Sequence, residues 1–176
     1  MSTKEAYNIC IILDTSAIIR SSALRFSGSK KVYTTPSTLH ELKGSEMKTL
    51  EVAFLIREGR LVVRSPERDA RLVVVRFAKK TGDIRNLSDA DIDVIALAID
   101  LRKNGEHPLV LTSDYAIQNV LSFLNIDFES VGIRSIRGAV NWRYFCPSCG
   151  RRYSGKISCS ICGTRLVRKR ATIRHN

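Results

Sequence analysis

Residues 11–19 read IILDTSAII, an apolar stretch that holds one carboxylate, Asp14, and two hydroxyls, Thr15 and Ser16. A short run rich in isoleucine is typical of a strand that is buried on both faces, as in a parallel sheet. The segment YNICIILD (residues 7–14) therefore predicts a buried strand that ends at Asp14. Because the chemistry of open parallel sheets gathers at the carboxyl ends of their strands, Asp14 is the first candidate functional residue.

Strand-like and helical patterns alternate along the chain after this point. We predict further strands at KVYTT (31–35), RLVVRSP (60–66), HPLVLTSD (107–114) and IDFESV (126–131). Helices are predicted at 36–44, 45–59, 67–82, 86–105 and 115–125. The second of these rests on the helical spacing of Met47, Leu50, Ala53 and Phe54. This alternation predicts an α/β domain with a parallel sheet flanked by helices on both faces.

The length and composition of the chain set its class. Its 176 residues, of which 44% are hydrophobic, suffice for one ordinary domain and a small appendage. No apolar run approaches the roughly 18 residues of a membrane span. The first residues, MSTKEAYNIC, lack the pattern of a secretory signal. We therefore expect a soluble cytoplasmic protein with no membrane partner.

The net charge of +12 is concentrated near the carboxyl end. Residues 134–176 contain 11 lysines and arginines and no acids, whereas the rest of the chain balances 18 bases against 17 acids. A basic segment of this kind favours a polyanionic partner, most often nucleic acid, although it also occurs as a solvated tail. Aromatic residues lie among these lysines and arginines, for example Tyr144 and Tyr153. They either stack on unpaired nucleobases or cover the strands of their own module.

Four of the five cysteines lie in this basic segment with C-x2-C-x9-C-x2-C spacing: Cys146, Cys149, Cys159 and Cys162. Each pair fits a tight turn followed by a glycine, and two such turns form a tetrahedral four-thiolate site that suits Zn²⁺. The alternative, disulfide bonding, is disfavoured in a chain without an export signal. All four ligands come from the protein, so we predict one structural zinc ion in a small ribbon that needs the metal to fold. The remaining cysteine, Cys10, is expected to be a core residue.

Four acids fall at positions that face the carboxyl edge of the predicted sheet: Asp14, Glu41, Asp91 and Asp114. Taken singly, each has a simpler explanation. Three of them fit helix caps, with Asp91 in a capping box with Ser88, and Glu41 fits an ordinary surface residue. Taken together, four carboxylates at one edge require a cation or bound protons, and oxygen ligands of this kind suit Mg²⁺ or Mn²⁺. Such a metal supports phosphodiester hydrolysis, and no phosphate-binding loop is found in the sequence.

The acidic segments, in their order, resemble the four motifs of the PIN-domain ribonucleases. They are ILDTSAII (12–19), Glu41, LSDADIDVIALA (87–98) and LTSDYAIQNVL (111–121). The added cysteine ribbon, followed by CGTRLVRK (162–169), makes the chain similar to the Nob family, and its compact size resembles archaeal members. The resemblance implies a PIN-like nuclease domain at 1–131, a linker at 132–144, a zinc ribbon at 145–168 and a basic tail at 169–176.

Residue by residue, the resemblance implies that Asp14, Glu41, Asp91 and Asp114 bind a catalytic Mg²⁺ or Mn²⁺, with Ser16 assisting beside Asp14. Asp91 is preferred over Asp93, which lies about 200° away round the helix. Asp89 is a weaker candidate.

The family resemblance further implies hydrolysis of single-stranded RNA that leaves a 3′ hydroxyl and a 5′ phosphate. The implied substrate is precursor ribosomal RNA at the 3′ end of the small-subunit RNA, within the pre-small ribosomal subunit. Two alternatives stay open, namely a PIN ribonuclease that acts on mRNA or tRNA and a non-catalytic RNA-binding assembly factor.

Overall fold

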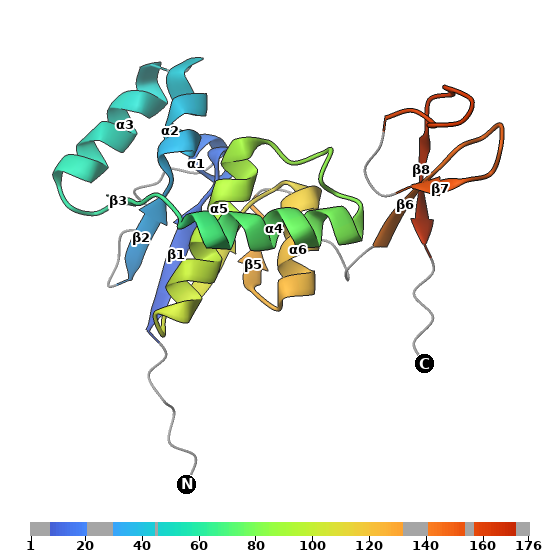
Figure 1. The fold of residues 1–176 in the computed structure, drawn as a ribbon. Helices are drawn as coiled ribbons and strands as arrows, with labels where there is room; N and C mark the ends of the chain where they lie inside the picture. The colour runs from blue at the N-terminus through green and yellow to red at the C-terminus, as the bar shows by residue number, and fades with distance from the viewer. Residues whose placement is uncertain (1–7, 21–29, 45, 132–140, 154–156, 172–176) are drawn as a thin grey trace, which may run out of the picture.

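The strands lie where the sequence predicts them. The structure is a computed structural model that describes residues 8–20, 30–44, 46–131, 141–153 and 157–171 (Figure 1). Its larger sheet has five parallel strands in the order β3-β2-β1-β4-β5. They are β1 (Ile9–Leu13), β2 (Lys31–Thr34), β3 (Val62–Val63), β4 (His107–Leu111) and β5 (Asp127–Glu129). The chain changes direction across the sheet between β1 and β4, the point at which doubly wound sheets place their sites.

Helices connect these strands and cover both faces of the sheet, as predicted (Figure 1). They are α1 (Thr15–Arg20), α2 (Pro36–Glu41), the 3-10 turn η2 (Leu42–Gly44), α3 (Glu46–Arg57), α4 (Arg68–Thr81), α5 (Asp89–Lys103) and α6 (Tyr115–Leu124). Local sequence sets their ends. Thr35 caps α2 in front of Pro36, and Gly82 ends α4 with φ +83°, a conformation that glycine adopts without steric cost.

Alternate residues of β1 point into two separate cores. Cys10 and Ile12 pack against α4, α5 and α6 on one face, whereas Ile11 and Leu13 pack against α1 and α3 on the other. All four side chains are buried. A strand that feeds both cores fixes its own register, because a slip of one residue would exchange the two faces. The carboxyl end of β1, and with it Asp14, is therefore rigidly placed.

The sequence pattern identified α3, but the apolar residues whose spacing indicated it do not form its buried face. Met47, Leu50 and Phe54 are 82%, 72% and 52% exposed, and the residues that enter the core are Val52 and Leu55. Apolar residues occur on both sides of this helix, so periodicity alone could not choose between them. The side that packs is the one that meets Leu42 and Leu61 in the second core.

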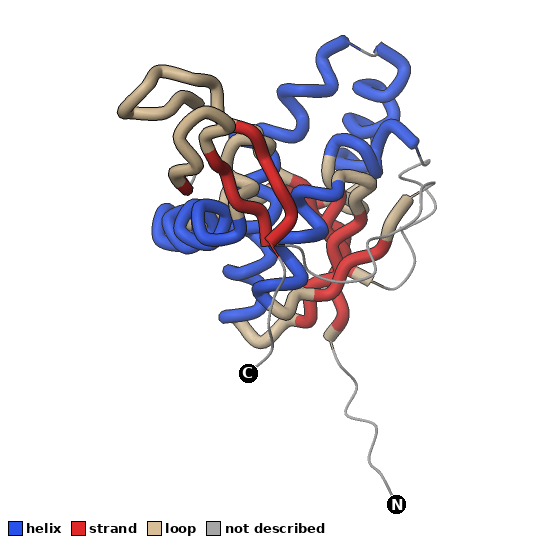
Figure 2. The backbone as a smooth tube through the Cα atoms, turned by 90° about the vertical axis from the view of Figure 1, so that its right-hand side faces the viewer, coloured by secondary structure: helices blue, strands red, loops and turns tan. Residues whose placement is uncertain are grey.

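The basic carboxyl-terminal segment forms a separate antiparallel sheet in the order β7-β6-β8. Its strands are β6 (Asn141–Phe145), β7 (Arg152–Tyr153) and β8 (Val167–Ala171). Figure 2, seen from the side of this sheet, shows it beside the helices of the larger unit, where β6 contacts α4. The predicted boundaries at 144/145 and 168/169 fall inside β6 and β8, because strand pairing extends beyond the cysteines. Residues 132–140 of the predicted linker and 172–176 of the predicted tail lie outside the described residues.

In the part of the chain that the structure describes, no helix is both long enough and apolar enough to cross a membrane.

The two sides of α3 predict opposite effects of the same substitution. Leu55 is 1% exposed, so Leu55→Ala should lower the free energy of unfolding by about 2–5 kcal/mol. Leu50→Ala on the exposed side is the matched control and should change it by less than about 0.5 kcal/mol. Chemical denaturation of both variants measures the difference. A larger loss for Leu50→Ala would place the buried face on the side of Leu50.

Candidate functional site

Asp14 is a buried carboxylate at the carboxyl end of the central strand β1. Its side chain is 4% exposed and accepts hydrogen bonds from Thr112 Oγ1 at 2.5 Å, the Ala17 backbone N–H at 2.6 Å and Ser16 Oγ at 2.9 Å. Burial raises the pKa of Asp14 although these donors oppose it, and the charge of Asp114 raises it further. Three donors therefore orient the carboxylate, while the loss of hydration disfavours its charged form.

Two hydroxyls join the ends of β1 and β4. Thr112, which is fully buried, donates to Asp14 and accepts from the backbone N–H of Asp114 at 3.0 Å. Ser16 donates to Asp14 and accepts from the backbone N–H of Ser113 at 2.9 Å. Sequence reasoning named Ser16 and missed Thr112. A hydroxyl placed directly after the strand HPLVL and two residues before an acid was the available signal.

Glu41 is the last residue of α2 and is exposed at the rim of this site. Its two carboxylate oxygens accept from different elements, Oε2 from Thr15 Oγ1 of α1 at 2.5 Å and Oε1 from Ser88 Oγ at 3.3 Å. The side chain therefore connects the start of α1 with Ser88 at the start of α5.

Asp91 and Asp114 both lie at helix starts. Asp91 forms a capping box with Ser88, in which its Oδ2 accepts from the Ser88 backbone N–H at 2.7 Å. Asp114 caps α6 by accepting from the Ala116 backbone N–H at 2.6 Å. The simpler explanation of these acids as caps is therefore correct as a description of their local contacts. Capping does not remove their charge, however, and the charge of Asp114 raises the pKa of both Asp14 and Asp91.

The four acids interact electrostatically. Burial raises the pKa of Asp91, its contacts with Ser88 oppose the shift, and the charges of Asp114 and Glu41 add to it. The acids are nonetheless spaced more widely than a closed ligand shell. Among the described residues, the one group of three or more potential ligands whose atoms all lie within 4.8 Å of one another is a cysteine cluster. Carboxylate oxygens of this kind are the hard ligands that Mg²⁺ and Mn²⁺ bind in proteins together with water molecules.

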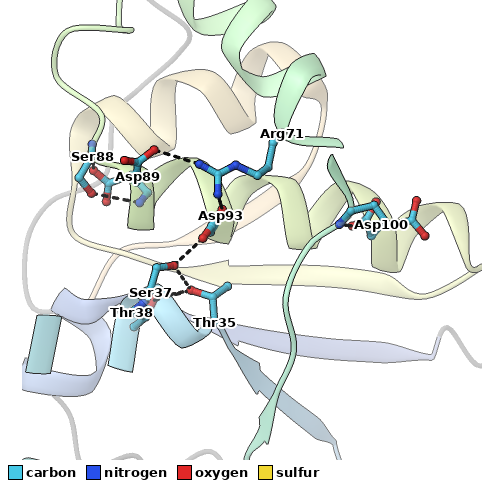
Figure 3. Close-up of polar contacts among 10 residues, drawn as sticks. Thr35, Ser37, Thr38, Arg71, Ser88, Asp89, Asp93 and Asp100 are labelled. Atoms are coloured by element: carbon cyan, nitrogen blue, oxygen red, sulfur yellow. Dashed lines mark hydrogen bonds and ion pairs between the residues drawn. The ribbon is translucent and has the colours of Figure 1, made fainter. Parts of the chain in front are cut away.

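Two neighbouring acids of α5, Asp89 and Asp93, form ion pairs with an arginine (Figure 3). Arg71 of α4 forms ion pairs with Asp89 at 2.9 Å and with Asp93 at 2.8 Å. Asp93 is 7% exposed and also accepts from Ser37 Oγ at 2.7 Å, so it joins α5 to α4 and α2. Both acids therefore have a cationic partner in Arg71.

The four ribbon cysteines converge on one point. They are Cys146, Cys149, Cys159 and Cys162, and their sulfur atoms all lie within 4.8 Å of one another. Sγ–Sγ distances of 3.4 Å (Cys146 to Cys162) and 3.5 Å (Cys149 to Cys159) are near the roughly 3.8 Å edge of a tetrahedron with 2.3 Å metal–sulfur bonds. A hydrogen bond with Tyr153 lowers the pKa of Cys159 to about 5 and favours the thiolate that binds metal. The donor set fits a tetrahedral metal site.

Comparison with known proteins gives consistent matches. The family model described as PIN domain of ribonuclease matches residues 11–101. Endoribonuclease Nob1 of Methanothermobacter thermautotrophicus is 39% identical over 90% of this chain and 92% of its own length. Ribonuclease VapC1 of Thermoplasma acidophilum is 32% identical over 93% of this chain and 79% of its own length. The 20S-pre-rRNA D-site endonuclease nob1 of Schizosaccharomyces pombe is 33% identical over 52% of this chain and 23% of its own length.

The raised pKa of Asp91 predicts a pH-dependent cost of its charge. Because its folded pKa lies above 3.8, ionised Asp91 opposes folding at neutral pH, and the cost disappears as the pH falls through the folded pKa. Without added divalent cation, Asp91→Asn should therefore raise Tm by about 1–3 °C near neutral pH. The amide oxygen still accepts from Ser88, and the gain should vanish as the pH approaches 3.8.

Glu58→Gln, at an exposed position beyond α3, is the charge-matched control, and its Tm shift should not follow this pH profile. A lower Tm for Asp91→Asn at neutral pH would show that the contacts of the carboxylate outweigh the cost of its charge.

Proposed function

This chain belongs to the PIN-domain ribonucleases, and within them to the Nob1 endoribonucleases, and on that premise we propose that it cleaves precursor ribosomal RNA at the 3′ end of the small-subunit RNA. The endoribonuclease activity follows from membership of the family. The choice of substrate is supported by the Schizosaccharomyces pombe relative, whose name specifies a 20S pre-rRNA D-site endonuclease. The proposed setting is the pre-small ribosomal subunit in the cytoplasm.

The proposed catalytic residues are the acids of the sheet edge, with Ser16 in support. Asp14, Glu41, Asp91 and Asp114 would hold a divalent cation, Mg²⁺ or Mn²⁺, and their mutual repulsion supports this assignment because a cation relieves it. When bound, such an ion polarises a phosphoryl oxygen and lowers the pKa of a bound water. Ser16 and Thr112 would keep Asp14 in one orientation through the contacts described above.

The chain itself would position the scissile phosphate. The amino-terminal ends of α5 and α6 meet at the acidic edge, and their partial positive charge offsets part of the repulsion that an incoming phosphate would feel. In the proposed reaction, water oxygen forms a bond to phosphorus and the bond from phosphorus to O3′ breaks. O3′ leaves with a proton as a 3′ hydroxyl, and the phosphate stays on the 5′ side of the next nucleotide.

The ribbon would supply the grip on RNA. We propose that the four cysteines bind one structural Zn²⁺, and that the lysines and arginines of the ribbon contact the RNA backbone. The net excess of basic residues after residue 133 supports this division of roles. Tyr144 does not fit the stacking role, because it is 3% exposed and donates to the Gly82 carbonyl at 3.0 Å.

A second candidate function has one observation in its favour. The VapC1 relative aligns over 93% of this chain, which includes part or all of the ribbon, so the ribbon alone does not separate the two classes of ribonuclease. A ribonuclease that acts on mRNA or tRNA is therefore the alternative. Cleavage of structured precursor and unrelated RNAs side by side distinguishes them.

The decisive experiment pairs cleavage with binding. Wild-type protein with Mn²⁺ should cut an RNA that spans the 3′ junction of the precursor at one position, and Asp14→Asn should lose at least about 10²-fold in rate. The variant should bind the same RNA normally in the absence of the metal. Cleavage sites are mapped on end-labelled RNA.

Asp127→Asn, an exposed acid of β5, is the matched control and should cleave at the wild-type rate. Equal rates for Asp14→Asn and the wild type would remove the assigned site. Efficient cleavage of mRNA or tRNA in place of the junction would favour the alternative function.

The zinc assignment predicts a separate loss. Cys149→Ser should lower bound zinc from one per chain and weaken RNA binding, while the helical content of the nuclease domain persists. Cys10→Ala is the control, because burial raises the pKa of this thiol to about 12 and removes it from the set of ready metal ligands. Metal analysis and fluorescence anisotropy measure the two effects. Unchanged zinc content in Cys149→Ser would contradict a four-thiolate site.

A further inference from the structure

The connector between α4 and α5 carries a buried acid that the proposed chemistry does not use. Asp83 follows the helix-ending Gly82, and its side chain is 1% exposed. The backbone around it is fixed, since the Asp83 N–H donates to Ala78 at 2.9 Å and the Asn86 N–H donates to Asp83 at 2.7 Å. A carboxylate buried in so short a connector needs strong partners to be tolerated.

One of those partners comes from the ribbon. The guanidinium of Arg168 in β8 donates to Asp83 Oδ1, and it also faces the side-chain amide of Asn86. Tyr144 of β6 adds two contacts with the same connector. Its hydroxyl donates to the Gly82 carbonyl at 3.0 Å, and its ring lies 5.3 Å from the guanidinium carbon of Arg85. Two strands of the ribbon sheet therefore contact the connector, β8 through Arg168 and β6 through Tyr144.

Another partner of Asp83 comes from α6. Asn119, which is 2% exposed, donates to Asp83 Oδ2 at 2.5 Å. The helix that carries Asn119 starts at Asp114, and the connector that carries Asp83 leads within a few residues to Ser88 and Asp91. Asp83 is thus a junction between the ribbon and the two helices that present Asp114 and Asp91 to the acidic edge.

We propose that Asp83 and Arg168 are positioning residues that hold the ribbon against the nuclease domain and, through the α4–α5 connector, fix Ser88 and Asp91 for cleavage. This inference rests on the proposed function and extends it. The ribbon then contributes to the chemical step as well as to the grip on RNA. A small displacement of the connector matters, because a shift of about 1 Å in a catalytic group can cost about 10²-fold in rate.

The two partners allow a test that separates positioning from electrostatic attraction for RNA. Asp83→Asn makes the chain more basic, whereas Arg168→Gln makes it less basic, so their effects on non-specific RNA binding should differ in sign. A positioning role predicts that both variants lower the single-turnover cleavage rate at saturating protein by about tenfold or more. The double variant should lose less than the product of the two single losses, because it leaves no unpaired buried charge.

A second measurement does not depend on activity. ¹⁵N relaxation of the wild-type chain should give one rotational correlation time for amides of both sheets, and Arg168→Gln should give two. Arg57→Gln, an exposed arginine at the end of α3, is the matched control and should leave relaxation and cleavage unchanged. Arg168→Gln leaves the buried Asp83 carboxylate with the Asn119 donor but without its cation, so the melting curve of each variant checks that the nuclease domain stays folded under the assay conditions.

Separate correlation times in the wild type would overturn the docking, whether or not the protein cleaves RNA. Common tumbling with unchanged cleavage in both variants would overturn the positioning role and leave the ribbon as a passive grip. Opposite changes in cleavage rate for Asp83→Asn and Arg168→Gln would assign the effect to charge and also overturn the proposal. Absence of cleavage in the wild type, by contrast, would count against the proposed function and leave the relaxation test intact.

Discussion

A buried carboxylate at the end of a central strand is the constraint on which the rest of this molecule depends. Asp14 sits where the strand order reverses direction, and its three donors come from the start of α1 and the end of β4. Burial makes its charge costly, and those donors lower the cost without removing it. Ionised Asp14 therefore costs free energy in the folded chain, and a bound proton or a nearby cation would lower that cost.

The same acids serve two purposes at once. Asp91 and Asp114 each accept hydrogen bonds at the start of a helix, and each also adds negative charge at the sheet edge. A single side chain can do both because a capping carboxylate uses part of its hydrogen-bonding capacity and retains its charge. Arg71 shows how the neighbouring acids are kept out of this arrangement, since it pairs with Asp89 and Asp93 on the adjacent face.

Much of the fold was predictable because short-range rules decide it. The strand and helix positions follow from periodicity, caps and breakers, and the four acids follow from their places after strands and at helix starts. Three features were not predictable for a common reason, which is that they depend on contacts between distant segments. The buried side of α3 is chosen by Leu42 and Leu61, the role of Tyr144 by Gly82, and the partner of Asp83 by β8. Thr112 differs from these three, because its place between a strand and an acid was a sequence signal, although the carboxylate that it orients is set by the pairing of β4 with β1.

Pairing β1 with β4 also sets when the molecule becomes competent during its own synthesis. Asp14 and the hydroxyl that orients it are 98 residues apart in the chain. The first acid leaves the ribosome long before Thr112, and until β4 is added beside β1 it lacks both that donor and its neighbour Asp114. Contacts of such long range form late and slowly compared with local ones. A growing chain therefore carries its acids in an unassembled form, and only a nearly finished sheet brings them together.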